Sequence, residues 1–231
     1  MSNPSHQRTE RRPGATYRGM VVPYVSSWSS ERPARRKVVV RPLSGIGFVD
    51  EVPGDRDEHG VLWRRVPSSP GVGEPEFGNI HTSRQCQAMR DLLCQVCGGP
   101  ADQTAEGTLW LLKDHRGDWP DWPHRMGVTE PPICLPCAQT ARDACPALRR
   151  EGHVALRVAG CPVSGISGAL YRAGGVYPSA TATGMAMVAF DDPAARWIQA
   201  AHLVREITRC TIVDLDNQQP NADQPDDTED T

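Results

Sequence analysis

Four of the eight cysteines form two pairs with the spacing of a metal site. Cys94 and Cys97 are separated by two residues, and Cys134 and Cys137 repeat that spacing after 36 intervening residues. Two residues between cysteines allow both thiolates to reach one ion, and two such pairs complete a tetrahedral shell of four sulfur ligands. The spacing therefore predicts a Zn²⁺ ion held by these four cysteines. Because such a shell leaves no position open for water, this zinc would be structural and would not catalyse.

Paired cysteines also occur by chance or in redox sites. A redox Cys-x-x-Cys motif accompanies a βαβ unit, and no such pattern surrounds either pair. We interpret Cys86, Cys161 and Cys210 as small buried hydrophobic residues. We interpret Cys145 in the same way, with the alternative that it binds the zinc in place of one of the four paired cysteines.

The residues around the two pairs predict different local structures. Gly98 and Gly99 follow the first pair, as a tight turn requires, whereas a short helix-forming stretch, 138–145, follows the second. Between the pairs, residues 107–113 predict a hairpin, and a loop rich in Trp, Pro and Asp covers 114–132. This order of knuckle, hairpin, loop and helix start is that of a treble-clef zinc module, which we expect over residues 80–150.

The rest of the chain predicts an α+β protein, with small antiparallel sheets and short helices around this module. A β-rich region is expected over 19–66, a Pro- and Gly-rich linker over 67–79, and a helix over 83–93. An α+β C-terminal region is expected over 151–216. Short apolar or β-branched runs predict the strands, which are 19–25, 37–41, 45–52, 61–66, 153–158, 169–171, 185–190 and 211–215.

A last helix is expected after Asp192, which has the properties of an N-cap followed by Pro193 at the first helical position. Apolar residues recur after it at helical spacing. The residues expected on its buried face are Trp197, Ile198, Ala201, Val204 and Ile207.

The two ends of the chain carry opposite charge. Residues 1–41 contain nine basic and two acidic side chains, whereas residues 211–231 contain seven acidic side chains and no basic one. Segments 1–18 and 217–231 also lack Leu, Ile, Val and Phe, so we expect a disordered basic arm and a disordered acidic tail. The basic arm would either contact phosphates or stay solvated and limit aggregation. The candidate phosphate contacts are Arg11, Arg12, Arg35, Arg36 and Lys37.

No apolar run approaches the ~18 residues that span a bilayer, and residues 1–20 lack the apolar stretch of a secretory signal. We therefore expect a cytoplasmic protein without a membrane partner, in a reducing compartment where paired cysteines bind metal. Of the 25 basic residues 23 are Arg, which we interpret as codon bias of a GC-rich genome such as that of an actinobacterium or its phage.

The residues from Cys94 to Cys137 resemble the zinc-supported HNH endonucleases. The matching segments are Cys94-x-x-Cys97-Gly, Lys113-Asp114-His115 and Ile133-Cys134-x-x-Cys137. The resemblance implies a treble-clef fold in which His115 is the general base that activates water. It also implies that Asp114 is a ligand of a catalytic Mg²⁺ or Mn²⁺ ion.

The chain departs from that family at two positions. No Asn lies between His115 and Cys134, although the family uses a middle Asn to orient its base. Ala138 follows the second pair, where family members often have His. The resemblance therefore carries the zinc ligands and one catalytic position.

The loop after His115 has two interpretations. Asp118, Asp121 and His124 recur every three residues in a Pro-rich segment, so a polyproline II helix would place them on one edge, where they and His115 could bind an ion. The alternative is a surface loop whose tryptophans, Trp119 and Trp122, contact the core or a partner.

Three functions follow from these residues. The first is a non-enzymatic, zinc-stabilised protein that binds DNA or RNA, or a protein of the DNA machinery, with Trp119 and Trp122 among its contacts. The second is a metal-dependent, HNH-like endonuclease that uses His115. The third is a protein–protein adaptor. The sequence contains no phosphate-binding loop, no His-Glu-x-x-His motif and no Gly-x-Ser-x-Gly motif.

Overall fold

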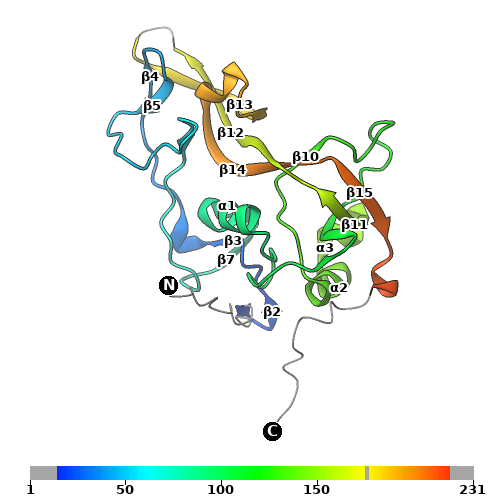
Figure 1. The fold of residues 1–231 in the computed structure, drawn as a ribbon. Coiled ribbons are helices and arrows are strands. Elements are labelled where there is room, and N and C mark those ends of the chain that lie inside the picture. The colour runs from blue at the N-terminus through cyan, green and yellow to red at the C-terminus, as the bar shows by residue number, and fades with distance from the viewer. Residues whose placement is uncertain (1–14, 175–176, 219–231) are drawn as a thin grey trace, which may run out of the picture.

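The computed structural model describes residues 15–174 and 177–218. Figure 1 shows an α+β fold of several small sheets and few helices, as the sequence predicts. Arg11, Arg12 and most of the expected acidic tail lie outside the described residues. Within the described part of the chain, no helix is long and apolar enough to cross a membrane.

The strands are short at the N-terminal end of the chain and longer toward its C-terminal end. They are β1 (Thr16–Tyr17), β2 (Met20–Val21), β3 (Ser26–Trp28), β4 (Val38–Arg41), β5 (Gly45–Phe48), β6 (Leu62–Trp63), β7 (Pro75–Ile80), β8 (Gln103–Thr104), β9 (Gly107–Lys113), β10 (Met126–Val128), β11 (His153–Gly160), β12 (Val163–Ala173), β13 (Ala180–Ala189), β14 (Ile198–Ile207) and β15 (Arg209–Val213). The helices are α1 (Thr82–Asp91), α2 (Leu135–Ala144) and α3 (Pro146–Glu151), and the short 3₁₀ turns are η1 (Ser29–Glu31), η2 (Pro193–Trp197) and η3 (Leu215–Asn217).

The segment after Asp192 differs from the expected helix. Asp192 caps a turn as predicted, because its Oδ1 accepts a hydrogen bond from the amide of Ala194 at 2.7 Å. That turn, η2, spans only five residues, and the chain then continues as strand β14. β14 lies inside a five-stranded sheet of order β10-β14-β12-β13, and β6 pairs with it in parallel.

Burial of β14 on both faces explains why its sequence suggests a helix. Ile198 and Ala200 belong to one apolar cluster, and Leu203 and Ile207 belong to another. A strand covered on both faces shows no alternation of polar and apolar residues. The expectation of a helix is wrong because the apolar residues of a fully buried strand also fit helical spacing.

A second sheet, of order β15-β11-β9-β8, lies beside the first. Residues 107–113, expected as a hairpin, form the single strand β9, whose hairpin partner is β8. The neighbour β11 extends two residues beyond the predicted 153–158. The main apolar cluster joins this sheet, β14 and helix α1, and it contains Met89, Trp110, Leu156 and Leu203. The buried side-chain amide of Gln85 in α1 also bonds both backbone groups of Leu203, at 2.9 Å each. Figure 1 shows β12 and β14 running from the part that contains β4 and β5 toward the part that contains α2.

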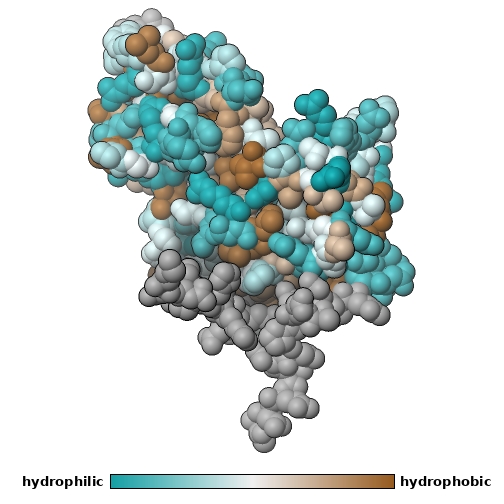
Figure 2. Space-filling view, in the orientation of Figure 1, coloured by the Kyte–Doolittle hydropathy of each residue, from teal (hydrophilic) through white to brown (hydrophobic). Residues whose placement is uncertain are grey.

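In the N-terminal region the expected strands 19–25, 45–52 and 61–66 shorten to β2, β5 and β6, and other strands form where the sequence predicts none. β1 and β2 pair with each other, although residues 16 and 17 fall in the expected disordered arm. β7 occupies the end of the expected linker, 67–79, and pairs with β3. Figure 2 shows that hydrophilic residues cover much of the visible face, and apolar residues appear on it in separate patches.

Candidate metal centre

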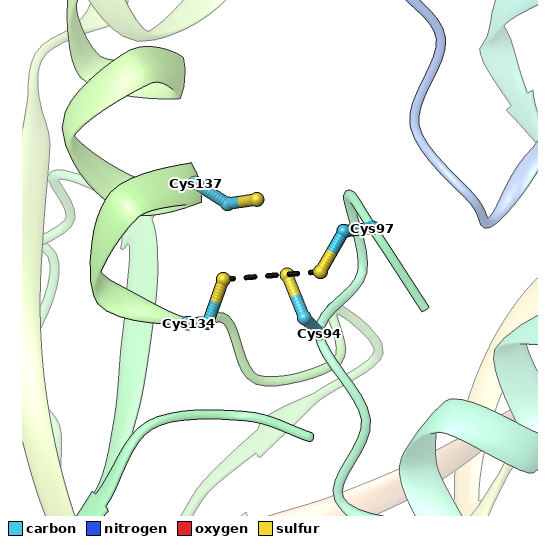
Figure 3. A group of neighbouring side chains, drawn as sticks. All are labelled: Cys94, Cys97, Cys134 and Cys137. Carbon is cyan, nitrogen blue, oxygen red and sulfur yellow. Dashed lines mark hydrogen bonds between the residues drawn. The ribbon is translucent and has the colours of Figure 1, made fainter. Parts of the chain in front are cut away.

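The sulfur atoms of Cys94, Cys97, Cys134 and Cys137 all lie within 4.8 Å of one another. Figure 3 shows the four side chains directed toward a common centre, two from a loop and two from the start of α2. The Cys97 and Cys134 sulfurs are 3.8 Å apart. A tetrahedral zinc site with Zn–S distances of about 2.3 Å has sulfur atoms about 3.8 Å apart. The arrangement therefore has the dimensions of a zinc site.

Backbone hydrogen bonds shape the loop that carries the first pair. The amide of Cys94 donates to the Gly99 carbonyl at 2.7 Å, and the amide of Gly98 donates to the Cys94 carbonyl at 2.9 Å. The amide of Val96 donates to the Cys94 sulfur at 3.4 Å, which places a partial positive charge beside a ligand. Gly98 has a φ of +72°, a left-handed conformation that favours glycine.

The start of α2 positions the second pair. Cys134 is the N-cap residue, with extended backbone angles, and Ala138 donates to its carbonyl at 2.9 Å. The residue before it, Ile133, is held against β9, because its amide donates to the Leu109 carbonyl at 2.9 Å. Cys137 lies in the first helical turn, where the helix dipole favours negatively charged sulfur.

The candidate metal centre is part of the apolar core. Cys94 and Cys134 are buried, and Cys97 and Cys137 are half-buried. The buried residues packed around them are Leu109, Leu111, Ile133, Leu135, Ala138, Ala155 and Leu215. An ion at this position would therefore connect the β9–β11 sheet, α2 and the cysteine loop.

The thiols influence one another strongly. Hydrogen bonds from Cys134, Cys137 and Cys94 hold the pKa of Cys97 far below its ordinary value. Hydrogen bonds with Cys134, Cys94 and Cys97 raise the pKa of Cys137 far above its ordinary value. Without a cation the cluster can thus ionise only in part, because four adjacent thiolates would repel one another. A soft divalent cation such as Zn²⁺ offsets that repulsion between thiolates and fits a closed set of sulfur ligands.

The other cysteines lie outside this group. Cys145 ends α2 and is not among the four clustered sulfurs, so it does not replace a ligand. Burial raises the pKa of the Cys86 thiol to about 11 and also raises the pKa values of Cys161 and Cys210. All three pack with the main apolar cluster, as predicted for small hydrophobic residues.

Asp114 and His115 follow the end of β9. The guanidinium of Arg116 binds the Asp114 carboxylate at 2.6 Å and lowers its pKa to about 2. His115 is exposed, and its Nδ1 lies 2.8 Å from Oδ2 of Asp118. The sequence grouped Asp118 with His115 as possible ligands of one ion and did not predict this direct contact, although the i, i+3 spacing of two polar residues in a turn-rich segment was a signal for it.

The segment after His115 forms successive turns. The amides of Asp118, Trp122 and His124 donate to carbonyls three residues earlier, at 3.0, 3.2 and 2.8 Å. A polyproline II helix has no such internal hydrogen bonds, so that interpretation is wrong. Among the described residues, only the four cysteines gather as a group that could hold a metal ion.

The two tryptophans of this loop differ in exposure. Trp122 is half-buried and packs against the main apolar cluster. Trp119 is 38% exposed and lines a cavity of about 330 Å³, together with His115 and Asp118. Trp119 is therefore available for contact with a partner.

The predicted phosphate contacts within the described residues lie just before β4. Arg35, Arg36 and Lys37 are all exposed. Arg36 pairs with Asp50 at 2.5 Å. Among the described residues, no acidic side chain forms an ion pair with Arg35 or Lys37.

Comparisons of the chain with protein-family models, with curated proteins and with solved structures give no match. The resemblance to HNH endonucleases therefore has no support beyond the residues that carry it.

Proposed function

We propose that residues 94–137 form a treble-clef-like structural zinc module in a non-enzymatic binding protein. Its partner would be nucleic acid or a protein of the DNA machinery. The observation that carries the proposal is the closed cluster of four sulfurs inside the apolar core. A closed sulfur shell stabilises a fold and leaves no coordination position for a substrate or water.

The order of elements around the cluster supports the treble-clef part of the proposal. A cysteine loop is followed by the β8–β9 hairpin, by a long loop and by α2, whose N-cap is the third ligand. In a zinc ribbon, both ligand pairs would lie on hairpins. Here only the first pair lies in a loop next to a hairpin, and the second lies at a helix N-terminus.

Exposed cations support the choice of nucleic acid as partner. Arg35 and Lys37 are exposed, and no described acidic group neutralises them, so both can replace the counterions of phosphates. Trp119 is partly exposed and offers a surface on which a base can stack. The two cations lie just before β4, and Trp119 lies in the loop after β9.

Salt-dependent binding tests this proposal. In fluorescence anisotropy with labelled single- and double-stranded DNA, affinity should fall steeply as the salt concentration rises, with a slope of about −0.9 per neutralised phosphate on duplex. The variant Arg35→Ala/Lys37→Ala should bind more weakly and reduce the slope by about 2. The matched control, Arg149→Ala/Arg172→Ala, removes the same charge from exposed arginines elsewhere and should leave binding unchanged. Equal effects of the two variants would contradict a site at Arg35 and Lys37. If the chain captured a specific protein but bound no DNA, the result would favour a protein–protein adaptor.

The contact between His115 and Asp118 favours a metal-dependent, HNH-like endonuclease as a second candidate. A carboxylate at 2.8 Å from Nδ1 fixes the orientation of the ring, a role that the family assigns to Asn. An endonuclease should nick supercoiled plasmid with Mg²⁺ or Mn²⁺ and lose this activity in His115→Ala. The control His59→Ala changes another exposed histidine and should retain it. Absence of nicking by the wild-type protein with either ion would exclude this candidate.

A further inference from the structure

The strand β13 has a free edge. It lies at one end of the five-stranded sheet, and its inner edge pairs with β12. β4 approaches the beginning of its outer edge, where Val39 bridges Ser179 and the Val40 amide donates to the Pro178 carbonyl at 2.8 Å. From Thr181 onward, no strand among the described residues pairs with the outer edge of β13.

The sequence of β13 does not protect this edge. Folded proteins discourage unwanted pairing by placing Lys, other charged residues or Pro on edge strands. The ten residues of β13, ATATGMAMVA, contain no charged residue and no proline. β13 is therefore open to pairing with another strand.

The hydrogen-bond pattern shows which backbone groups face outward. Near one end of the pair, Phe190 donates to the Ser164 carbonyl at 3.2 Å, and antiparallel pairs alternate between bonded and non-bonded positions. In the observed register Met187 is opposite Ser167 and Met185 is opposite Ala169. Counting from Phe190, both methionines occupy non-bonded positions, so their N–H and C=O groups point away from β12.

The methionine side chains are exposed on one face of this edge. Met185 is 67% exposed and Met187 is 48% exposed, and residues two apart on a strand share a face. Ala186 and Val188 lie on the opposite face and pack against the cluster around Ile198. β13 thus combines unpaired backbone groups with two large apolar side chains.

We propose that β13 pairs in antiparallel fashion with β13 of a second copy of the chain, about a two-fold axis at Ala186. This axis places Met185 opposite Met187 of the second copy. Both residues have outward-facing backbone groups, so each such pair exchanges two hydrogen bonds. The five-stranded sheet then continues across the dimer.

A second copy fits this edge because the strand is complementary to itself. A two-fold axis brings the same patch of both copies together, so any charge close to the axis would face its own copy. Residues 183–189, which the axis at Ala186 pairs with one another, are all uncharged. The four methionines meet on one face, where their flexible, polarisable side chains can pack together. The regular ladder with β12 runs from Ala189 to Gly184, and a bulge at Thr183, opposite Leu170 and Tyr171, ends it at the border of this stretch.

The test is the mass of the zinc-loaded, full-length chain in solution, measured by light scattering and sedimentation over a range of concentrations. The proposal predicts a dimer with twice the chain mass of 25.3 kDa. The variant Met185→Lys/Met187→Lys should raise the dimer dissociation constant about 100-fold or more, because it places like charges across the interface. The variant Met185→Leu/Met187→Leu keeps the apolar contact and should remain dimeric.

The control is Ile212→Lys, which adds a charge at a 54%-exposed residue of β15, the edge strand of the other sheet, and should remain dimeric. Circular dichroism of each variant checks that it is folded. Hydrogen exchange should also show protection of the Met185 and Met187 amides that increases with protein concentration. A monomer at all concentrations, or a dimer that tolerates both lysines without loss, would overturn the proposal.

Discussion

The aromatic ring of Tyr24 lies against Gly98, the residue at which the chain turns after Cys97. A Cβ atom at Gly98 would be 2.8 Å from that ring. The Tyr24 amide also donates to the Val96 carbonyl at 2.8 Å. Because Tyr24 lies just before β3, the cysteine loop holds the N-terminal strands against the candidate metal centre.

Substitution of Gly98 should destabilise the fold through both backbone strain and this contact. Gly98→Ala places a side chain at φ +72° and against Tyr24, so we expect a loss of about 1–3 kcal/mol in the free energy of unfolding. Urea denaturation followed by tryptophan fluorescence measures it. Gly54→Ala is the control, because Gly54 has a φ of +96° but no atom within 4 Å of the added Cβ. An equal cost for both variants would show that the Tyr24 contact contributes nothing.

The buried ion pair between Arg157 and Asp102 predicts a larger loss. Both side chains are 1% exposed, and Nη1 of Arg157 lies 2.5 Å from Oδ1 of Asp102. Asp102→Asn leaves a buried guanidinium without its counterion, which costs about 3–5 kcal/mol. The control is Glu151→Gln, which breaks the solvent-exposed pair with Lys113 and should cost less than about 1 kcal/mol. Similar unfolding midpoints in denaturant for the two variants would contradict this expectation.

Glu31 should make stability depend on pH. Burial raises its pKa, but hydrogen bonds from Arg84 and from the amides of Ser69 and Trp28 outweigh burial and lower the pKa from 4.5 to about 2. The folded state therefore favours the ionised form. Its contribution of about 3 kcal/mol is present above pH 4.5 and is lost as the pH falls from 4.5 toward 2.

The difference in unfolding free energy between the wild type and Glu31→Gln measures this contribution. The difference should be largest near pH 7 and should shrink below pH 4.5, because the protonated carboxyl then resembles the amide. Glu58→Gln, at an exposed glutamate, should show no such trend. A constant difference across this pH range would show that the Glu31 pKa is the same in the folded and unfolded states.

Local patterns in the sequence predict the elements that depend on nearby residues. The spacing of Cys94 and Cys97 indicates a metal-binding loop, and the run 107–113 has the bounds of β9. The Asp192 cap is confirmed, because a cap depends on residues two or three positions away. The strand β14 after it was not predicted, because its burial depends on distant elements, with α1, β9 and β11 packed on one face and Val61 and η2 on the other.

Contacts between distant residues leave no local pattern. Glu31 and Arg84 are 53 residues apart, and Asp102 and Arg157 are 55 residues apart, yet each pair forms a buried ion pair. Strand β7 lies largely within the expected linker, and its pairing with β3 likewise depends on residues that are distant in the sequence. The sequence therefore predicted the four cysteines that cluster and the strand beside them, but it did not predict the buried charges that stabilise the surrounding fold.

Removal of the metal should unfold the region around α2. Structural zinc contributes on the order of 10 kcal/mol, which is comparable to the whole stability of a typical domain, about 5–15 kcal/mol. A strong chelator should therefore lower the melting temperature and increase hydrogen exchange in residues 94–145. Exchange in β12 and β13, which lie in the other sheet, should increase less. Unchanged melting after complete removal of metal would contradict a structural role.

The most direct test of the central claim is the zinc content of protein purified without added metal, measured by elemental mass spectrometry. We predict about one zinc per chain for the wild type and for Cys161→Ser, and almost none for Cys94→Ser/Cys134→Ser. A wild-type content below half an equivalent, or equal zinc in both cysteine variants, would contradict a site formed by Cys94, Cys97, Cys134 and Cys137.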